Sequence, residues 1–250
     1  MKLIKDLLAT LPDGVVQNIG MGAFWTAVVV EVAGRQQCGL ASTLRQEGHH
    51  HSGGNAMQNS GALLNYSARQ LAELAASPRV MERSIGLATI NALLPRLKDS
   101  WQDINAADII AQRGAGKRVA LVGHFPFVSR LQAQVGSLQV LEQRPQGQDL
   151  PAEAARSVIP QADIVAITGN TLLNHTFEAL LALCSPGSLV MVLGPSTPVS
   201  PVLFDYGVHL VSGTIVEDIS GVLRAVCQGG NFRQVKQQGT RLVTIQKQNL

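Results

Sequence analysis

The chain has 250 residues, of which 46% are hydrophobic and 15% are charged, and its formal net charge is +3. This length allows one large domain or two small ones. Lys and Arg are scattered, and no basic run is interleaved with aromatic residues, which argues against a nucleic-acid partner. No apolar run is long enough to cross a membrane, and Asp6 and Asp13 interrupt the apolar pattern that a signal peptide needs. We therefore expect a soluble, cytoplasmic protein.

The three cysteines, Cys38, Cys184 and Cys227, are odd in number and far apart. This pattern argues against a disulfide framework and against a zinc site made of thiolates. It fits a protein of the reducing cytosol.

Residues 1–97 predict a small α+β domain. Its first segment, 1–11, is amphipathic and should form a helix that Pro12 ends. Ser77 is the expected N-cap of a later helix, with Pro78 at the first helical position. We expect strands at 15–21, 26–32 and 36–41, and further helices at 68–76 and 79–94.

A polar, Gly-rich segment at 42–61 contains three consecutive histidines, His49, His50 and His51. Because neighbouring side chains of an extended chain point in opposite directions, two of the three rings could bind one metal ion. The alternative is a solvated loop, since no Cys or Asp that would complete a metal site lies close by.

After a predicted linker region at 98–117, strands alternate with helices over residues 118–250. Short apolar runs bounded by Gly and Pro fit parallel strands that are buried on both faces. We expect strands at 119–122, 138–141, 163–168, 189–193, 208–212 and 241–245, and helices at 127–135, 152–158, 174–183 and 215–227. The alternation predicts an α/β fold, in which a Rossmann-like, doubly wound and mostly parallel sheet follows the smaller α+β domain.

Ligands of open α/β sheets bind outside the carboxyl ends of the strands. The loops expected there are rich in Gly, hydroxyl and amide groups, which suits an anionic or strongly hydrogen-bonding ligand. The alternative is that these residues are turn formers and helix caps alone. The loops are Gly123-His124-Phe125-Pro126, Glu142-Gln143-Arg144, Thr168-Gly169-Asn170-Thr171, Gly194-Pro195-Ser196-Thr197 and Gly213-Thr214.

The sequence fingerprint of dinucleotide binding is missing. A G-x-G-x-x-G pattern should follow the first strand, but Gly123 is followed by His124 and no such pattern. Glu142 does lie at the end of the second strand, where an acid could hold a ribose. The segment 114–117 is not a phosphate loop either, because it precedes its strand. Conventional NAD binding is therefore not expected.

Three histidines outside the 42–61 segment have different expected roles. His124, at the end of a strand, can act as an acid, a base or a metal ligand near neutral pH, or it can simply fill its loop. His175 follows Asn174, a predicted N-cap, so we expect a depressed basicity and a structural role. His209 is expected inside a strand, packed or at an edge.

Further polar residues could reach the same edge of the sheet. Thr214 and Glu217 match a capping box, so Glu217 is interpreted as structural, whereas Asp218 is free to face the loops. Asn91 is a lone amide on an apolar helix, and a buried amide must find hydrogen-bond partners. A cleft between the two domains would supply them, and hydrogen bonds within the core are the equal alternative.

Four segments together resemble a known family, the putative heavy-metal chelation domain family. They are Gly86-Leu87-Ala88-x-x-Asn91-Ala92, Val122-Gly123-His124-Phe125-Pro126, Thr168-Gly169-Asn170-Thr171-Leu172-x-Asn174-x-Thr176 and Gly194-Pro195-Ser196-Thr197-Pro198. The resemblance implies an enolase N-terminal-like α+β domain, then a Rossmann-like domain, and a cleft shared by both. It does not imply enolase chemistry, because that catalytic apparatus belongs to a barrel that this chain lacks.

Three functions follow as hypotheses. In the first, the chain binds, with or without processing it, a small anionic or metal-chelating ligand in the cleft between the domains. Asn91 would close over it, and His124 would contact the ligand or a divalent metal ion. In the second, an enzyme acts on a nucleotide-like or heterocyclic substrate with His124 as acid and base. In the third, the chain is a structural dimer module.

His124 is thus both the catalytic and the metal-binding candidate, and we expect a homodimer because the apolar content is high for so little charge. The predicted ligand-binding residues are Asn91, Gly123, Phe125, Pro126, Glu142, Thr168, Gly169, Asn170, Thr171, Asn174, Gly194, Pro195, Ser196, Thr197, Gly213 and Asp218.

Overall fold

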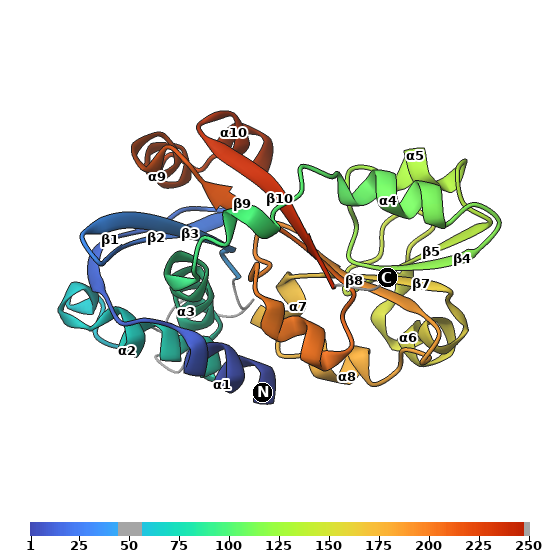
Figure 1. Cartoon of the computed structure of the whole chain (residues 1–250), viewed down its shortest axis with the longest axis horizontal. Helices are drawn as coiled ribbons and strands as arrows, with labels where there is room; N and C mark the ends of the chain where they lie inside the picture. Colours follow the sequence, from blue (N-terminus) through green and yellow to red (C-terminus); the bar gives the residue numbers. More distant parts are fainter. Residues whose placement is uncertain (45–56, 248–250) are drawn as a thin grey trace.

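A computed structural model describes residues 1–44 and 57–247, so the three loop histidines at 49–51 lie outside the described residues. A three-stranded antiparallel sheet lies beside a seven-stranded, mostly parallel sheet (Figure 1). The predicted fold class is therefore confirmed. Within the described residues, no helix is long and apolar enough to span a membrane.

The smaller unit combines the antiparallel sheet, in the order β1-β2-β3, with helices on one of its faces. Gly39 of β3 lets α3 approach closely, because a Cβ at this position would lie 2.2 Å from the carbonyl oxygen of Ala88. The elements are α1 (Lys2–Thr10), β1 (Val15–Met21), β2 (Trp25–Val32), β3 (Arg35–Ser42), α2 (Ala68–Glu73) and α3 (Val80–Leu93).

The start of α3 differs from the prediction. Ser77 ends a 3₁₀ turn, and its hydroxyl accepts a hydrogen bond from the Arg79 backbone N–H and donates one to the Glu82 carboxylate. The helix therefore begins at Val80, and Pro78 does not occupy its first position. The Ser77-Pro78 pair therefore indicated that a helix begins nearby, but it placed the first helical residue at Pro78, two residues before the observed start at Val80.

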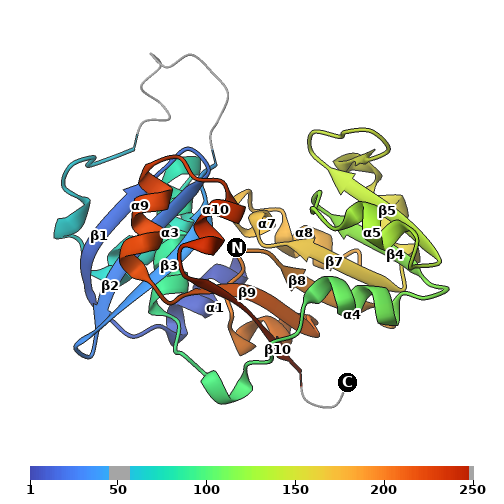
Figure 2. The same cartoon turned by 90° about the horizontal axis from the view of Figure 1, so that it is seen from above.

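The larger unit has the strand order β10-β9-β8-β7-β4-β5-β6, in which β10 alone runs antiparallel to its neighbour. Consecutive strands spread outwards in both directions from β4 and β7, as in doubly wound folds (Figure 2). The elements are α4 (Ala106–Arg113), β4 (Arg118–Val122), α5 (Val128–Gln132), β5 (Ser137–Glu142), β6 (Leu150–Pro151), α6 (Ala155–Val158), β7 (Ile164–Thr168), α7 (Asn170–Leu173), α8 (Phe177–Leu181), β8 (Leu189–Leu193), β9 (Leu210–Val216), α9 (Ile219–Cys227), α10 (Phe232–Gln237) and β10 (Thr240–Gln246).

Helices cover both faces of this sheet, α4 and α5 on one side and α6, α7 and α8 on the other (Figure 1). The strands are apolar on both faces for this reason. Along β4, Val119 and Leu121 belong to the core cluster under α4 and α5, and Ala120 belongs to the cluster on the opposite face. The predicted linker at 98–117 contains α4, and the domain boundaries stay a prediction.

The C-terminal part of the chain returns to the smaller unit. Helix α9 lies across the face of β1–β3 that α3 leaves open (Figure 1). Val222 and Val226 of α9 share a buried cluster with Ala27, Val29 and Leu40 of the small sheet. The small sheet is therefore packed between α3 on one face and α9 on the other.

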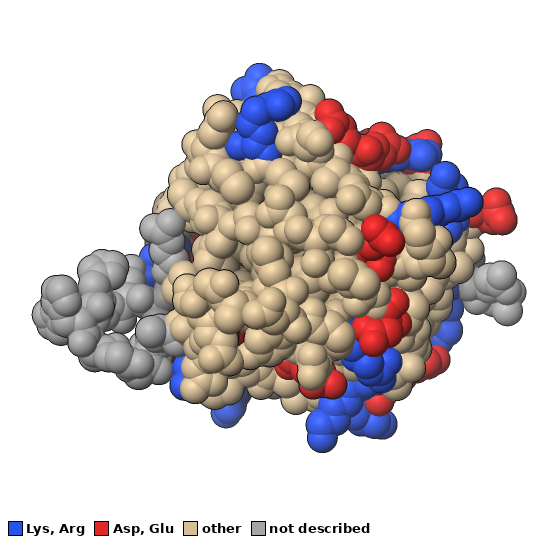
Figure 3. All heavy atoms as spheres, turned by 90° about the vertical axis from the view of Figure 1, so that its left-hand side faces the viewer, with Lys and Arg blue, Asp and Glu red and all other residues tan. Residues whose placement is uncertain are grey.

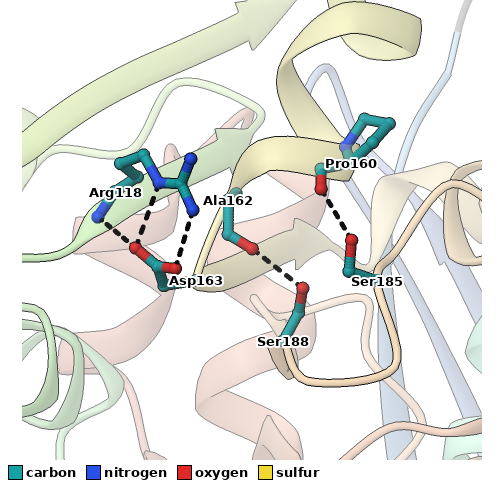
Figure 4. A network of polar contacts seen from close by, with 6 residues as sticks. All are labelled: Arg118, Pro160, Ala162, Asp163, Ser185 and Ser188. Atoms are coloured by element: carbon teal, nitrogen blue, oxygen red, sulfur yellow. Dashed lines mark hydrogen bonds and ion pairs between the residues drawn. The ribbon is translucent and has the colours of Figure 1, made fainter.

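The amino ends of the central strands are fixed by a polar network (Figure 4). Arg118 at the start of β4 pairs with Asp163, just before β7, and this lowers the pKa of the Asp163 carboxyl to about 2. The Ser188 hydroxyl donates to the Ala162 carbonyl oxygen at 2.8 Å. The carboxyl ends of the same strands carry the large cavity that is described next.

Candidate functional site

A cavity of about 830 Å³ opens at the carboxyl ends of β4, β5 and β7, where the strand order reverses. Doubly wound folds bind their ligands at this position. Leu44 borders the cavity from the smaller unit, and α6 and α8 provide largely apolar walls that include Ala155 and Leu180. The predicted residues that line it are Gly123, His124, Phe125, Glu142, Thr168, Asn170, Thr171 and Asn174.

Gly123 shapes the β4 side of the cavity. Its φ of 102° favours glycine, and a Cβ would lie 3.0 Å from the Thr168 side chain. The chain turns here and places His124 on the cavity wall. Pro126 follows this turn but does not line the cavity, and Phe125 stacks on Phe127 with ring centroids 5.1 Å apart.

The His124 ring is held by a carboxylate that the sequence analysis missed. Its Nδ1 atom lies 2.9 Å from an Asp149 oxygen, and the Asp149 side chain is 5% exposed while that of His124 is 47% exposed. A carboxylate partner fixes the Nδ1–H tautomer, so Nε2 carries the lone pair that can take a proton or a metal ion. Asp149 stands 25 positions from His124, and no motif marks it.

Glu142 connects two of the loops. One carboxylate oxygen accepts the His124 backbone N–H at 2.9 Å, and the other accepts the Gln143 N–H at 2.8 Å. Glu142 therefore fixes the backbone beside His124 while it lines the cavity. Glu153 and Arg156 add one charge of each sign to the opposite wall.

On the β7 side, Asn170 begins the short helix α7. Its Oδ1 atom accepts hydrogen bonds from the hydroxyls of Ser42, at 2.9 Å, and Ser196, at 2.8 Å. Ser42 ends β3, so the smaller unit reaches this side of the cavity through a side chain.

The structure does not bring the Gly194–Thr197 loop or Asn91 to the cavity. Asn91 donates from Nδ2 to the carbonyl oxygens of Leu40, at 2.8 Å, and Ser196, at 3.2 Å. These bonds hold the loop against the smaller unit, where Ser196 and Thr197 are buried. Gly169 also faces this loop, because a Cβ there would lie 2.6 Å from Thr197 Oγ1. Asn91 and Thr197 instead border a separate void of about 10 Å³, the size of one water molecule.

The predicted Gly213-Thr214 loop is wrong, because β9 continues to Val216 in pairing with β10. Thr214 is therefore inside a strand and forms no capping box with Glu217. Asp218 is the N-cap of α9, and its carboxylate accepts the Gly221 N–H at 2.9 Å. It serves the helix and does not face the cavity.

The helix predicted at 174–183 is present but shorter, because within that range only Phe177–Leu181 is helical, as α8. His175 has a φ of 61° and separates α7 from α8, so Asn174 caps no long helix. The Asn174 carboxamide oxygen accepts the Thr176 N–H and hydroxyl and closes this turn. The pKa of His175 is lowered, as predicted, but by burial. His209 precedes β9, and its Nδ1 accepts the Val190 N–H.

Among residues 1–44 and 57–247, no group of three or more His, Cys, Asp or Glu side chains is arranged to hold a metal ion. The described residues at the cavity offer one imidazole nitrogen that a carboxylate supports. That donor set fits a metal ion whose other ligands come from a small molecule, and it does not fit a closed structural site.

The DUF364 family, described as "Putative heavy-metal chelation", matches residues 105–244, which is more than half of the chain. The chain belongs to this family. A second family, DUF4213, with the same description, matches residues 4–94.

The chain is also similar to individual proteins. An uncharacterised protein of Methanocaldococcus jannaschii is 26% identical over 80% of this chain and 78% of its own length. A crystal structure of a DUF364 family protein of unknown function from Desulfitobacterium hafniense is 26% identical, covers 98% of this chain and 97% of that one, and has a TM-score of 0.82. Another, from Pyrococcus horikoshii, is 20% identical, covers 98% of both chains and has a TM-score of 0.81. It shows the fold alone.

Proposed function

We propose that the protein binds a small, anionic metal chelate in the cavity at the carboxyl ends of β4, β5 and β7, with His124 Nε2 as a ligand to the metal. The observation that carries this proposal is the pairing of His124 with the buried Asp149 at the wall of that cavity. A carboxylate behind an imidazole orients the ring and makes it a better ligand for divalent metals. The metal is cargo that arrives with its chelator.

The cavity has room for such a molecule. About 830 Å³ lies within the range of small-molecule sites, and apolar walls with a few polar groups are typical of them. The chelator must supply most of the metal ligands, because the described residues do not. The family description is consistent with this function.

Isothermal titration of untagged protein with nickel–citrate, nickel ion alone and citrate alone tests the proposal. We expect the complex to bind more tightly than either component. His124→Ala should bind nickel–citrate no more tightly than citrate alone. Asp149→Asn should bind nickel–citrate about 10- to 100-fold more weakly than the wild-type protein does. The matched control is His209→Asn, which keeps an acceptor for the Val190 N–H at the other end of the sheet and should bind normally.

A second candidate is an enzyme that acts on a nucleotide-like substrate with His124 as acid and base. Glu142 supports it, because it ends the second strand of the sheet, where Rossmann-like proteins place the acid that binds a ribose. Thermal stabilisation by adenosine or adenosylmethionine in the presence of EDTA, without any effect of nickel–citrate, would favour this function over the first. If neither the adenosine compounds nor nickel–citrate stabilise the protein, the third hypothesis, a structural dimer module, is favoured.

We also infer that two copies form a homodimer. The side of the molecule on which β1 lies has a broad area without charged side chains (Figure 3). Strand β1 contains no charged residue, and Val15 and Phe24 are more than half exposed. Light scattering should give twice the mass of 26.6 kDa. Phe24→Lys should give monomers, whereas Leu242→Lys, at the exposed β10, should not. A monomeric wild-type protein would refute the dimer.

A further inference from the structure

The amide of Asn170 is contacted by two serines that are distant in sequence. Ser42 of β3 and Ser196, after β8, both place their hydroxyl oxygens within 2.9 Å of Asn170 Oδ1. The two serines also contact each other, because the Ser42 backbone N–H donates to Ser196 Oγ at 2.9 Å. Ser196 is fully buried and Ser42 is 9% exposed, so water does not readily replace these bonds.

This arrangement fixes which end of the amide faces the cavity. Each hydroxyl proton needs an acceptor, and Asn170 Oδ1 accepts both. If the amide were reversed, its NH₂ group would face the two hydroxyls. One serine hydroxyl could then donate a hydrogen bond to the other, because the Ser196 and Ser42 oxygens are 3.3 Å apart. The hydroxyl proton of the second serine would be left buried without an acceptor. A buried hydrogen-bond donor without an acceptor destabilises the folded protein, so the observed orientation of the Asn170 amide is favoured.

The Nδ2 atom consequently lies on the other side of the amide. Among the described residues, none accepts a hydrogen bond from it, although Asn170 lines the large cavity. Asn91 provides the contrast within the same chain, because both bonds of its Nδ2 go to backbone carbonyl oxygens.

We propose that Asn170 determines the specificity of the cavity by donating from Nδ2 to an oxygen acceptor of the ligand, such as a carboxylate. Ser42 and Ser196 are positioning residues that hold the amide in this orientation. The inference rests on the proposed function for the identity of the ligand. It adds that the ligand carries an acceptor oxygen on the β7 side, and that the smaller unit contributes to specificity through Ser42.

The first test needs no ligand. In protein labelled with ¹⁵N-asparagine, the side-chain signals of Asn170 are assigned by their loss in Asn170→Asp. We expect the Asn170 NH₂ protons to exchange rapidly with water and those of Asn91 to be protected. Equal protection of both side chains would overturn the proposed orientation.

The second test measures binding. Asn170→Asp keeps an oxygen that accepts both serine hydroxyls, and it replaces the donor with a negatively charged oxygen. We expect nickel–citrate to bind at least about tenfold more weakly to this variant, because a hydrogen bond to a charged group is lost. Wild-type affinity for the complex would overturn the proposal.

The positioning role of the serines is tested by selectivity. Ser42→Ala and Ser196→Ala should weaken the binding of nickel–citrate and leave that of nickel ion alone, which brings no carboxylate, unchanged. An equal loss for both probes would show a merely structural role. If the wild-type protein does not bind nickel–citrate, the proposed function fails, and the NH₂ exchange alone decides the orientation of Asn170.

Discussion

At the scale of single residues, His209 shows how its surroundings set the protonation of a side chain. Burial lowers its pKa, and the nearby Lys247 lowers it further. Its Nδ1 accepts the Val190 N–H at 3.0 Å, a bond that only an unprotonated nitrogen can accept. The folded protein therefore favours the neutral ring more than the unfolded chain does.

This gives a pH dependence with a definite sign. A histidine whose pKa is lower in the folded state adds stability above its unfolded pKa, near 6.5, and this stability is lost as the pH falls through the folded pKa. We expect the melting temperature to drop between pH 7.5 and pH 5.5, and to drop less in His209→Asn. An identical drop in both proteins would contradict the assignment of this effect to His209.

At the scale of elements, the close crossing of α3 with the turn after α2 depends on Gly86. A Cβ at this position would lie 1.9 Å from the backbone nitrogen of Ala75. Backbone atoms cannot move aside as the end of a flexible side chain can, so the two elements would have to separate. Gly86 is thus a packing requirement inside a helix, where glycine is otherwise unfavourable.

Gly86→Ala should therefore reverse the usual effect of this substitution. In an open helix the change stabilises by about 1 kcal/mol, whereas here we expect a loss of about 1–3 kcal/mol from overpacking. Urea denaturation measures the difference. Gly187→Ala is the control, because a Cβ at Gly187 would meet no atom within 4 Å. A stabilised Gly86→Ala protein would show that α3 can shift at little cost.

At the scale of the whole molecule, the two units are interdependent. Helix α9 covers Val29 and Leu40 of the small sheet, and Asn91 and Ser42 bond to the loop after β8. Removing the C-terminal part would expose one whole face of the β1–β3 sheet. The smaller unit is therefore not expected to be stable alone, although β1, β2 and β3 form a sheet of their own.

A fragment of residues 1–97 should consequently bind a hydrophobic dye and unfold without a cooperative transition. Addition of a peptide of residues 217–239, which contains α9 and α10, should reduce the dye binding, because it restores the missing cover. Circular dichroism and dye fluorescence measure both effects. A cooperative, dye-free fragment would show that the smaller unit is an independent domain.

The sequence predicted local structure well. Apolar runs of four to six residues located the parallel strands, since a strand that is buried on both faces must be apolar throughout. The loops after the first, second and third of these strands were expected at one edge, and they do line one cavity. The predictions failed where local signals competed, as at Thr214, which matches a helix cap but continues β9 because β10 pairs with it.

Other features were decided by the tertiary structure alone. Asp149 reaches His124 across 25 positions, and Ser42 reaches Asn170 across 128. The loop after β8 looked like its neighbours in sequence, yet it is buried against the smaller unit through Asn91. Sequence patterns report periodicity and turn chemistry, which are local. Which loops stay open and which carboxylate stands behind a histidine depends on how distant elements pack, and no local pattern records that.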